Sequence, residues 1–225
     1  LDRNEFVQKF TAGFGSVVHG PYGEGQWFYQ ETKDELLSKV NAYEYSPEDA
    51  VTLLVEAGYT LNANGEEYKE GDGTRHRQNE DGELEPLLIK WCSTSNNPVS
   101  DILKVLLVEN PEVQKAGIEI KQETMDFGEL LEYYYRSQDD PKYAENDFNM
   151  FNLATNFNKT YDMTDSFSAD PAKIALGYNG NYLIDEELEE AANAIVETDP
   201  EDRDGFKEKF VNYITIWNDR LPQIP

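Results

Sequence analysis

The stretch "LLIKWCSTSNNPVSDILKVLLVENPEVQKAGIEIKQETMDFGELLEYYY", residues 87–135, decides the fold class. It begins inside a mostly apolar run, residues 84–91, that predicts a buried strand. After an amphipathic helix, "IEIKQETM", residues 118–125, alternates as a strand does, and Asp126 can cap the next helix. A last strand is expected over 147–154. The order strand–helix–strand–helix–strand calls for right-handed crossovers and predicts an α/β fold with a largely parallel, helix-covered sheet.

The region before this stretch is polar and then helical. Residues 59–83 carry four glycine turns and few apolar side chains, so we expect short strands joined by turns, with a mobile tip over 70–82. Upstream of it, "SPEDAVTLLVEAG", residues 46–58, predicts a helix. Ser46 is a suitable N-cap, proline follows at the first helical position, and Gly58 ends the helix.

Both ends of the chain are also predicted to be helical. Asp2 can cap a first helix, and a short helical run is expected over 33–40. Two longer helices close the chain over 185–198 and from Asp199-Pro200 onward. Each carries an apolar stripe at helical spacing that should face the core. The stripes are Leu188, Ala191, Ala192 and Ile195 in the first helix, and Phe206, Phe210, Tyr213, Ile214 and Trp217 in the second.

The composition excludes two classes of partner. The chain has 19 Lys and Arg against 45 Asp and Glu, a formal net charge of -26, and such a surface repels phosphate backbones and anionic lipid. We therefore expect neither nucleic-acid nor membrane-surface binding. No run approaches the roughly 20 apolar residues of a membrane span. The single cysteine, Cys92, lies in a strand-like run and is expected to be a buried, inert thiol.

No catalytic, metal or cofactor site is predicted. The only histidines, His19 and His76, have no metal-ligand spacing. "NANGE", residues 62–66, and "GDGT", residues 71–74, resemble parts of calcium loops but lack the full alternation of acids, so we interpret them as turns. The 45 acids nominate no catalytic pair. Paired carboxylates of a secreted hydrolase remain the alternative function at this point.

Two segments have the composition of a binding surface. "GPYGEGQWFY", residues 20–29, combines glycines and a proline with four aromatic side chains. "FNLATNFNKTYD", residues 151–162, follows the last predicted strand and offers neutral hydrogen-bonding and apolar groups, which suits a polar, partly apolar ligand. The alternatives are that Trp27 and Phe28 fill the core of the lobe, and that 151–162 is an ordinary surface loop.

Several segments, in order, resemble the C-terminal lobe of solute-binding proteins of ABC importers, in the oligopeptide/dipeptide/nickel class. The resemblance covers nearly the whole chain. It is carried by "LDRNEFVQKFTAGFGSVVHGPYG", "EYSPEDAVTLLVEAGYTLNANG", the stretch over 87–135, and "NGNYLIDEELEEAANAIVETDPEDRDGFKEKFVNYITIWNDRLPQIP" with its T-D-P helix start and L-P-x-[IV]-P end. The absence of an initiator Met and the proline-broken end agree with a piece excised from a longer, two-lobed protein.

The resemblance implies a type II periplasmic-binding-protein-like lobe over residues 1–225, with a polar mobile excursion near 62–82. It implies capture of a peptide or other small polar ligand by hinge closure, an ABC permease as partner, a monomer, and no cofactor. It also implies an extracytoplasmic location, with a signal sequence and often a lipidated cysteine upstream of residue 1. A non-transport sensor lobe of the same fold is a further alternative.

One motif of the family departs in this chain. Peptide binders of the class carry glycine-Trp-x-x-Asp after the last strand of this lobe, where the Asp takes the ammonium group of the ligand. Here Asn152, Leu153 and Asn156 align with the glycine, the Trp and the Asp, and Asp162 is a possible substitute for the missing acid. Asn156 can accept a hydrogen bond but cannot balance a charge. The residues expected to contact ligand are Tyr22, Trp27, Leu153, Thr155, Asn156, Phe157 and Asp162.

Overall fold

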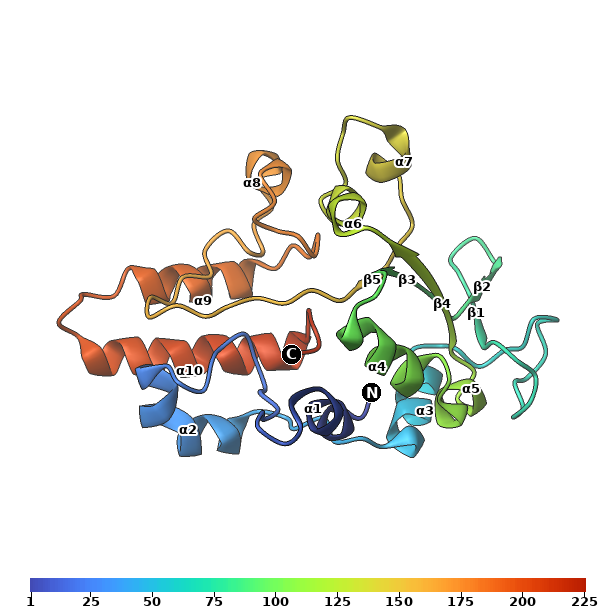
Figure 1. The fold of residues 1–225 in the computed structure, drawn as a ribbon, viewed down its shortest axis with the longest axis horizontal. Helices are drawn as coiled ribbons and strands as arrows, with labels where there is room; N and C mark the ends of the chain where they lie inside the picture. The colour runs from blue at the N-terminus through green and yellow to red at the C-terminus, as the bar shows by residue number, and fades with distance from the viewer. The chain divides into compact units, whose positions relative to one another are not determined.

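The computed structural model describes residues 1–225, and the chain divides into two compact units (Figure 1). Unit 1 contains Leu1–Ser16 and Glu44–Leu153. Unit 2 contains Val17–Tyr43 and Ala154–Pro225. The expectation of a single lobe over 1–225 stays a prediction, because it concerns a protein longer than this chain. No helix is both long and apolar enough to cross a membrane.

A parallel three-stranded sheet forms the centre of unit 1, as the sequence predicts. Its order is β4 (Glu119–Met125), β3 (Leu88–Thr94), β5 (Met150–Phe151). β3 pairs with β4 along its whole length, from Leu88 opposite Glu119 to Thr94 opposite Met125. It pairs with β5 through only two residues. The last strand is therefore shorter than the predicted 147–154.

Helices accompany the sheet on both sides of the strands (Figure 1). They are α4 (Pro98–Leu107), α5 (Pro111–Lys115), α6 (Phe127–Tyr134) and α7 (Pro141–Ala144). The buried apolar side chains of β3, of these helices and of their ends are Trp91, Cys92, Leu103, Leu106, Ala116 and Leu130. Cys92 is buried, as predicted, and burial raises the pKa of its thiol to about 12, which disfavours the reactive thiolate.

The polar region before β3 forms a second, two-stranded sheet in unit 1. β1 (His76–Gln78) pairs antiparallel with β2 (Leu84–Pro86). β1 and the isolated bridges from Leu61 to Glu67 and to His76 agree with the short strands and turns predicted over 59–83, whereas β2 lies in the run predicted as the next strand. The single strand predicted over 84–91 is wrong, because the chain passes from one sheet to the other at Leu87. Pro86 has no N–H to donate, which suits the end of a strand. Unit 1 is completed by α1 (Arg3–Thr11) and α3 (Pro47–Glu56).

Unit 2 is a helical assembly around one aromatic core. Its helices are α2 (Trp27–Lys39), α8 (Pro171–Ala175), α9 (Glu186–Val196) and α10 (Arg203–Arg220), and α10 packs against both α2 and α9. Every residue of the predicted α9 stripe is buried, and so is the α10 stripe except for the half-buried Phe206. The buried hydrophobic residues of the core are Tyr22, Phe28, Tyr29, Leu36, Tyr161, Phe167, Leu188, Ala191, Ala192, Ile195, Phe210, Val211, Tyr213, Ile214 and Trp217.

Two predicted helix starts in unit 2 are displaced. α2 begins at Trp27, although the sequence predicted a helix only over 33–40, so Trp27, Phe28 and Tyr29 belong to a helix and not to a loop. α10 begins after Asp202, whose side chain accepts a hydrogen bond from the Gly205 N–H at 2.9 Å, and not at Asp199-Pro200.

Helix capping follows one pattern with one exception. Nine of the ten helices have an Asp, Asn or Ser at the N-cap whose side chain accepts a hydrogen bond from a backbone N–H of the first turn. The exception is α2, where Gln26 holds the N-cap position and makes no such bond.

Candidate ligand-binding segment

The structure brings parts of the two predicted binding segments together within unit 2. The Gln26 Nε2 donates to the backbone O of Asn158 at 2.6 Å, across 132 residues of sequence. A Cβ placed on Gly23 would lie 3.4 Å from the Cβ of Phe157, an ordinary van der Waals distance. The turn over 20–26 and the segment Ala154–Thr160 therefore lie side by side.

The turn over 20–26 is compact because of its glycines and one amide. The Gln26 N–H donates to the Gly23 O at 3.0 Å, and the Gln26 Oε1 accepts from the Gly23 N–H at 2.9 Å. At Gly20, an added Cβ would lie 2.9 Å from the Cγ2 of Ile214. Only glycine fits at that distance without a shift of the α10 side chain.

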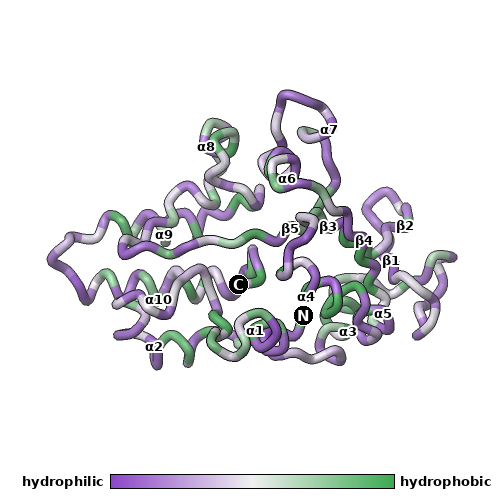
Figure 2. Tube along the Cα trace, viewed as in Figure 1, coloured by the Kyte–Doolittle hydropathy of each residue, from purple (hydrophilic) through white to green (hydrophobic).

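The segment Ala154–Thr160 has no helix or strand and exposes every side chain. Hydrophobic and hydrophilic residues alternate irregularly along it (Figure 2). Of all its backbone N–H and C=O groups, only the Asn158 O has a hydrogen-bond partner in the protein. Exposed backbone groups of this kind are hydrogen-bonded to water, which a ligand can displace. The segment therefore offers a run of donors and acceptors to a molecule outside the chain.

Four of the seven predicted ligand contacts lie in or next to this segment. Thr155, Asn156 and Phe157 are exposed, and Phe157 is 38% exposed as a whole residue. Leu153, 44% exposed, is the last residue of unit 1 and immediately precedes the segment in sequence. Asp162 is exposed beyond it, but its Oδ1 already accepts from the N–H and the Oγ1 of Thr164, at 3.0 and 2.7 Å.

Tyr22 does not offer the open aromatic wall that we expected. It is only 1% exposed, its ring stacks on Tyr29 with centroids 4.5 Å apart, and it meets Phe210 edge-on at 6.0 Å. Its hydroxyl accepts from the His19 N–H, and burial raises its pKa to about 12. The alternative interpretation, an aromatic residue that fills the core, describes Tyr22.

Trp27 is half-buried at the edge of the same core. Its ring packs against Phe206 with centroids 5.5 Å apart, and the Arg203 guanidinium lies 3.9 Å from its centroid. Arg203 also pairs with Glu31, whose carboxyl pKa is lowered by hydrogen bonding to that guanidinium. Because a cation already covers one face, Trp27 is a smaller apolar surface than the sequence suggested.

Two polar residues of the predicted 151–162 surface serve the interior instead. The Asn152 Oδ1 accepts from the Trp91 Nε1 at 3.0 Å and its amide also contacts Ser100, so Asn152 links β5 to β3 and α4. Tyr161 is buried in the core of unit 2, 5.3 Å from both Phe28 and Phe210 between ring centroids. Sequence reasoning missed Gln26, because no helix start was predicted there and its partner Asn158 is 132 residues away.

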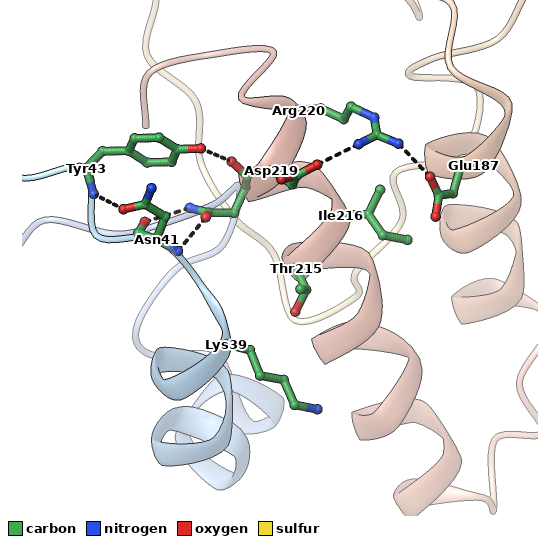
Figure 3. Close-up of a pocket in the computed structure, with 9 residues that line it drawn as sticks. Lys39, Asn41, Tyr43, Glu187, Thr215, Ile216, Asp219 and Arg220 are labelled. Atoms are coloured by element: carbon green, nitrogen blue, oxygen red, sulfur yellow. Dashed lines mark hydrogen bonds and ion pairs between the residues drawn. The ribbon is translucent and has the colours of Figure 1, made fainter. Parts of the chain in front are cut away.

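A separate hollow of about 370 Å³ lies in unit 2 at the ends of α2 and α10 (Figure 3). Its charged groups are already paired, since Arg220 contacts Asp185, Glu187 and Asp219 at 2.6–3.1 Å. The Tyr43 hydroxyl donates to the Asn218 O at 2.9 Å. The hollow therefore presents few free polar groups, and we assign no ligand to it.

The polar groups in the glycine-rich turns of unit 1 also form hydrogen bonds with one another. The Asn62 Oδ1 accepts from the N–H groups of Asn64 and Glu66, and its Nδ2 donates to Asp72. The Lys69 N–H also donates to Asp72, and this backbone bond is the main cause of the lowered pKa of the Asp72 carboxyl. These bonds are turn chemistry, as predicted. No group of three or more His, Cys, Asp or Glu side chains is arranged to hold a metal ion.

Comparison with known proteins gives a family match over most of the chain. The family described as bacterial extracellular solute-binding proteins, family 5, middle part, matches residues 1–172. No curated protein sequence matches significantly.

Solved structures match the chain at low identity and over its full length. The oligopeptide-binding protein AppA from Bacillus subtilis, in complex with a nonapeptide, has a TM-score of 0.74 and 21% identity, and covers 99% of this chain and 38% of its own. An oligopeptide-binding protein from Thermus thermophilus, with a pentapeptide, gives 0.76 and 20%, covering 100% and 35%. NikZ from Campylobacter jejuni, with Ni(L-His), gives 0.61 and 18%, covering 99% and 38%. The chain thus has their periplasmic-binding-protein-like fold and spans little more than a third of their length.

Proposed function

Since this chain belongs to the family 5 bacterial extracellular solute-binding proteins, we propose that it is the ligand-capturing part of an ABC-transporter substrate-binding protein, and that the ligand is an oligopeptide. The matched structures include both peptide and nickel-complex binders. The choice between these ligands therefore rests on the chemistry of the candidate segment.

The observation that carries the proposal is the unpartnered backbone of Ala154–Thr160. An extended peptide can hydrogen-bond to such a run through its own main chain, which gives affinity for many sequences. The exposed side chains there add apolar contact from Phe157 and neutral polar contact from Thr155 and Asn156. A surface of this kind suits a peptide backbone better than it suits a charged chelate.

The peptide N-terminus has no dedicated carboxylate in this segment. Asn156 is neutral, and one carboxylate oxygen of Asp162 is occupied by Thr164. A buried ammonium needs an opposite charge to hold it strongly. Acetylation of the peptide N-terminus should therefore change the dissociation constant by less than about threefold, since no charge pair is lost.

The family membership also supports a wider proposal about the full-length protein. The protein acts outside the cytoplasmic membrane as a monomeric, lipid-anchored receptor, closes about a hinge on its ligand, and delivers it to an ABC permease without a catalytic step. A part that supplies only some of the contacts should bind weakly. We therefore expect this chain alone to show little or no affinity for peptides.

The test is a titration of mixed four- to nine-residue peptides into the full-length protein that contains this chain. Asn156→Pro removes one backbone N–H from the segment, whereas Asn156→Ala removes only the side chain. We expect the proline variant to weaken binding by about tenfold, the value of one hydrogen bond to a peptide, and the alanine variant to weaken it less. Equal affinities of the two variants, or no binding by the unmodified protein, would contradict the proposal.

A further inference from the structure

Gln26 is the N-cap residue of α2, but its side chain does not cap that helix. The nine other N-caps bond to their own helices through Asp, Asn or Ser, and such caps stabilise a helix by about 1 kcal/mol. In α2 the glutamine side chain points away from its own first turn and bonds elsewhere. The start of α2 therefore lacks a cap, and the side chain is used for another contact.

That contact joins the turn over 20–26 to the candidate ligand-binding segment. One end of the Gln26 amide accepts from the Gly23 N–H at 2.9 Å, and the other donates to the Asn158 O at 2.6 Å. The residue is 8% exposed, so water competes little for these bonds. The Asn158 O is also the only backbone group of Ala154–Thr160 with a partner in the protein.

We propose that Gln26 is a positioning residue for ligand capture. It fixes the register of Ala154–Thr160 against α2, and so holds the free backbone groups of Ala154–Phe157 in place before a ligand arrives. The role is preorganisation, because a segment already ordered loses less conformational entropy on binding. The inference rests on the proposed function for its consequence in binding, but the link itself can be tested without any ligand.

Gln26→Glu is the sharpest substitution. It keeps the size of the side chain and an acceptor for the Gly23 N–H, but places a carboxylate oxygen against the Asn158 carbonyl oxygen. Gln26→Met removes both bonds and adds no charge. Gln30→Glu is the matched control, because it makes the same chemical change one turn later on α2. The Gln30 side chain is exposed and donates to the Glu24 O within the 20–26 turn, so this variant removes a bond of the turn but leaves the link to Asn158 in place.

The first measurement is trypsin cleavage after Lys159, which lies in the exposed segment next to the bonded carbonyl. In the ligand-free full-length protein, we expect both Gln26 variants to be cut there about tenfold faster. The reason is that the variants lack the bond to the Asn158 O, so local opening of the segment breaks one hydrogen bond fewer. Cleavage after Lys33 and Lys39, within α2, should not change. A general loss of stability would accelerate all three sites, and unchanged cleavage after Lys159 would overturn the link.

The second measurement is the affinity of the same variants for the peptide mixture. We expect Gln26→Glu and Gln26→Met to bind about tenfold more weakly, and Gln30→Glu to bind as the unmodified protein does. Faster cleavage with unchanged affinity would overturn the positioning role. If the unmodified protein binds no peptide, the proposed function fails and the role in capture fails with it, while the cleavage rates still decide whether the link exists.

Discussion

Asn218 fixes three parts of unit 2 through one buried side chain. Its Oδ1 accepts from the Asn41 N–H at 2.8 Å, and its Nδ2 donates to the backbone O of both His19 and Asn41 at 3.1 Å. The residue is 3% exposed and lies near the end of α10. Asn218 thus connects α10 to two places: His19, just before the 20–26 turn, and Asn41, just after α2.

Asn218→Ala should lower the free energy of unfolding of unit 2 by about 2–4 kcal/mol, because it leaves one N–H and two carbonyls without partners in a buried place. Urea unfolding followed by tryptophan fluorescence measures this, with Trp27 and Trp217 reporting on unit 2 and Trp91 on unit 1. Asn212→Ala, at an exposed site on the same helix, is the control and should have almost no effect. A loss as small as that of the control would refute the role of Asn218.

Tyr22 should make the protein sensitive to alkali. Its folded-state pKa is about 12, mainly because of burial, whereas an unfolded tyrosine has a pKa of about 10. The folded state therefore keeps its proton while the unfolded chain loses it. This contribution is fully present below pH 10 and falls as the pH rises towards 12, by about 2–3 kcal/mol in total.

The urea midpoint should accordingly drop between about pH 9 and pH 11.5. In Tyr22→Phe the drop should be smaller, although the variant starts from a lower stability because it loses the bond from the His19 N–H. Tyr161 and Tyr213 also have raised pKa values through burial, so part of the drop should remain. An identical drop in the variant would show that Tyr22 is not the buried acid responsible.

At the scale of elements, caps decide where most helices begin. The Asp126 Oδ1 accepts from the Glu129 N–H at 3.1 Å at the start of α6, directly after β4. The carboxylates of Asp126 and Glu129 both lie at the N-terminal end of α6, where the helix dipole favours negative charge.

Asp126→Ala should destabilise unit 1 by about 1 kcal/mol through loss of this cap. Hydrogen exchange of α6 amides, read by mass spectrometry at increasing urea, reports the change locally. Asp139→Ala, at an exposed loop position beyond the same helix, removes the same charge without removing a cap. If both variants lose equal stability, net charge and not capping explains the effect.

Elements with both a periodic apolar pattern and a start signal could be predicted from the sequence. α9 and α4 have both, and the alternation over 118–125 gave β4 almost to the residue. α2 had the pattern, with Phe28, Thr32 and Leu36 on its buried face, but its start was missed because glutamine is not a capping residue and the glycines before it indicated a loop.

The candidate site was predictable in sequence position but not in its contacts. The glycines and aromatic residues in 20–29 fit two structures equally well: a ligand-binding loop, and a turn whose aromatic side chains fill the core. Both need a sharply turning backbone and large apolar side chains. Burial, which separates the two, depends on α10, almost 190 residues away. The bond from Gln26 to Asn158 spans 132 residues, and no local pattern encodes it.

At the scale of the molecule, charge is the dominant feature. With 45 acidic and 19 basic side chains, the negative charges are in large excess, and pairing one cation with several acids does not change the net charge of -26. Surface ion pairs contribute little individually. Self-repulsion should therefore outweigh ion pairing.

Raising NaCl from about 10 to about 300 mM should increase the thermal unfolding midpoint by a few degrees, because salt screens the repulsion. Differential scanning calorimetry measures it, and the same ionic strength of KCl serves as control for specific sodium effects. A lower midpoint in salt would mean that pairs such as those of Arg220 with its three carboxylates stabilise the fold more than the net charge destabilises it.

The central claim, peptide capture, is tested most directly by a native mass spectrum of the full-length protein that contains this chain, purified without denaturation. We predict added masses that, on activation, release short peptides of varied sequence. A bare protein mass that added peptide mixtures do not shift would contradict the claim.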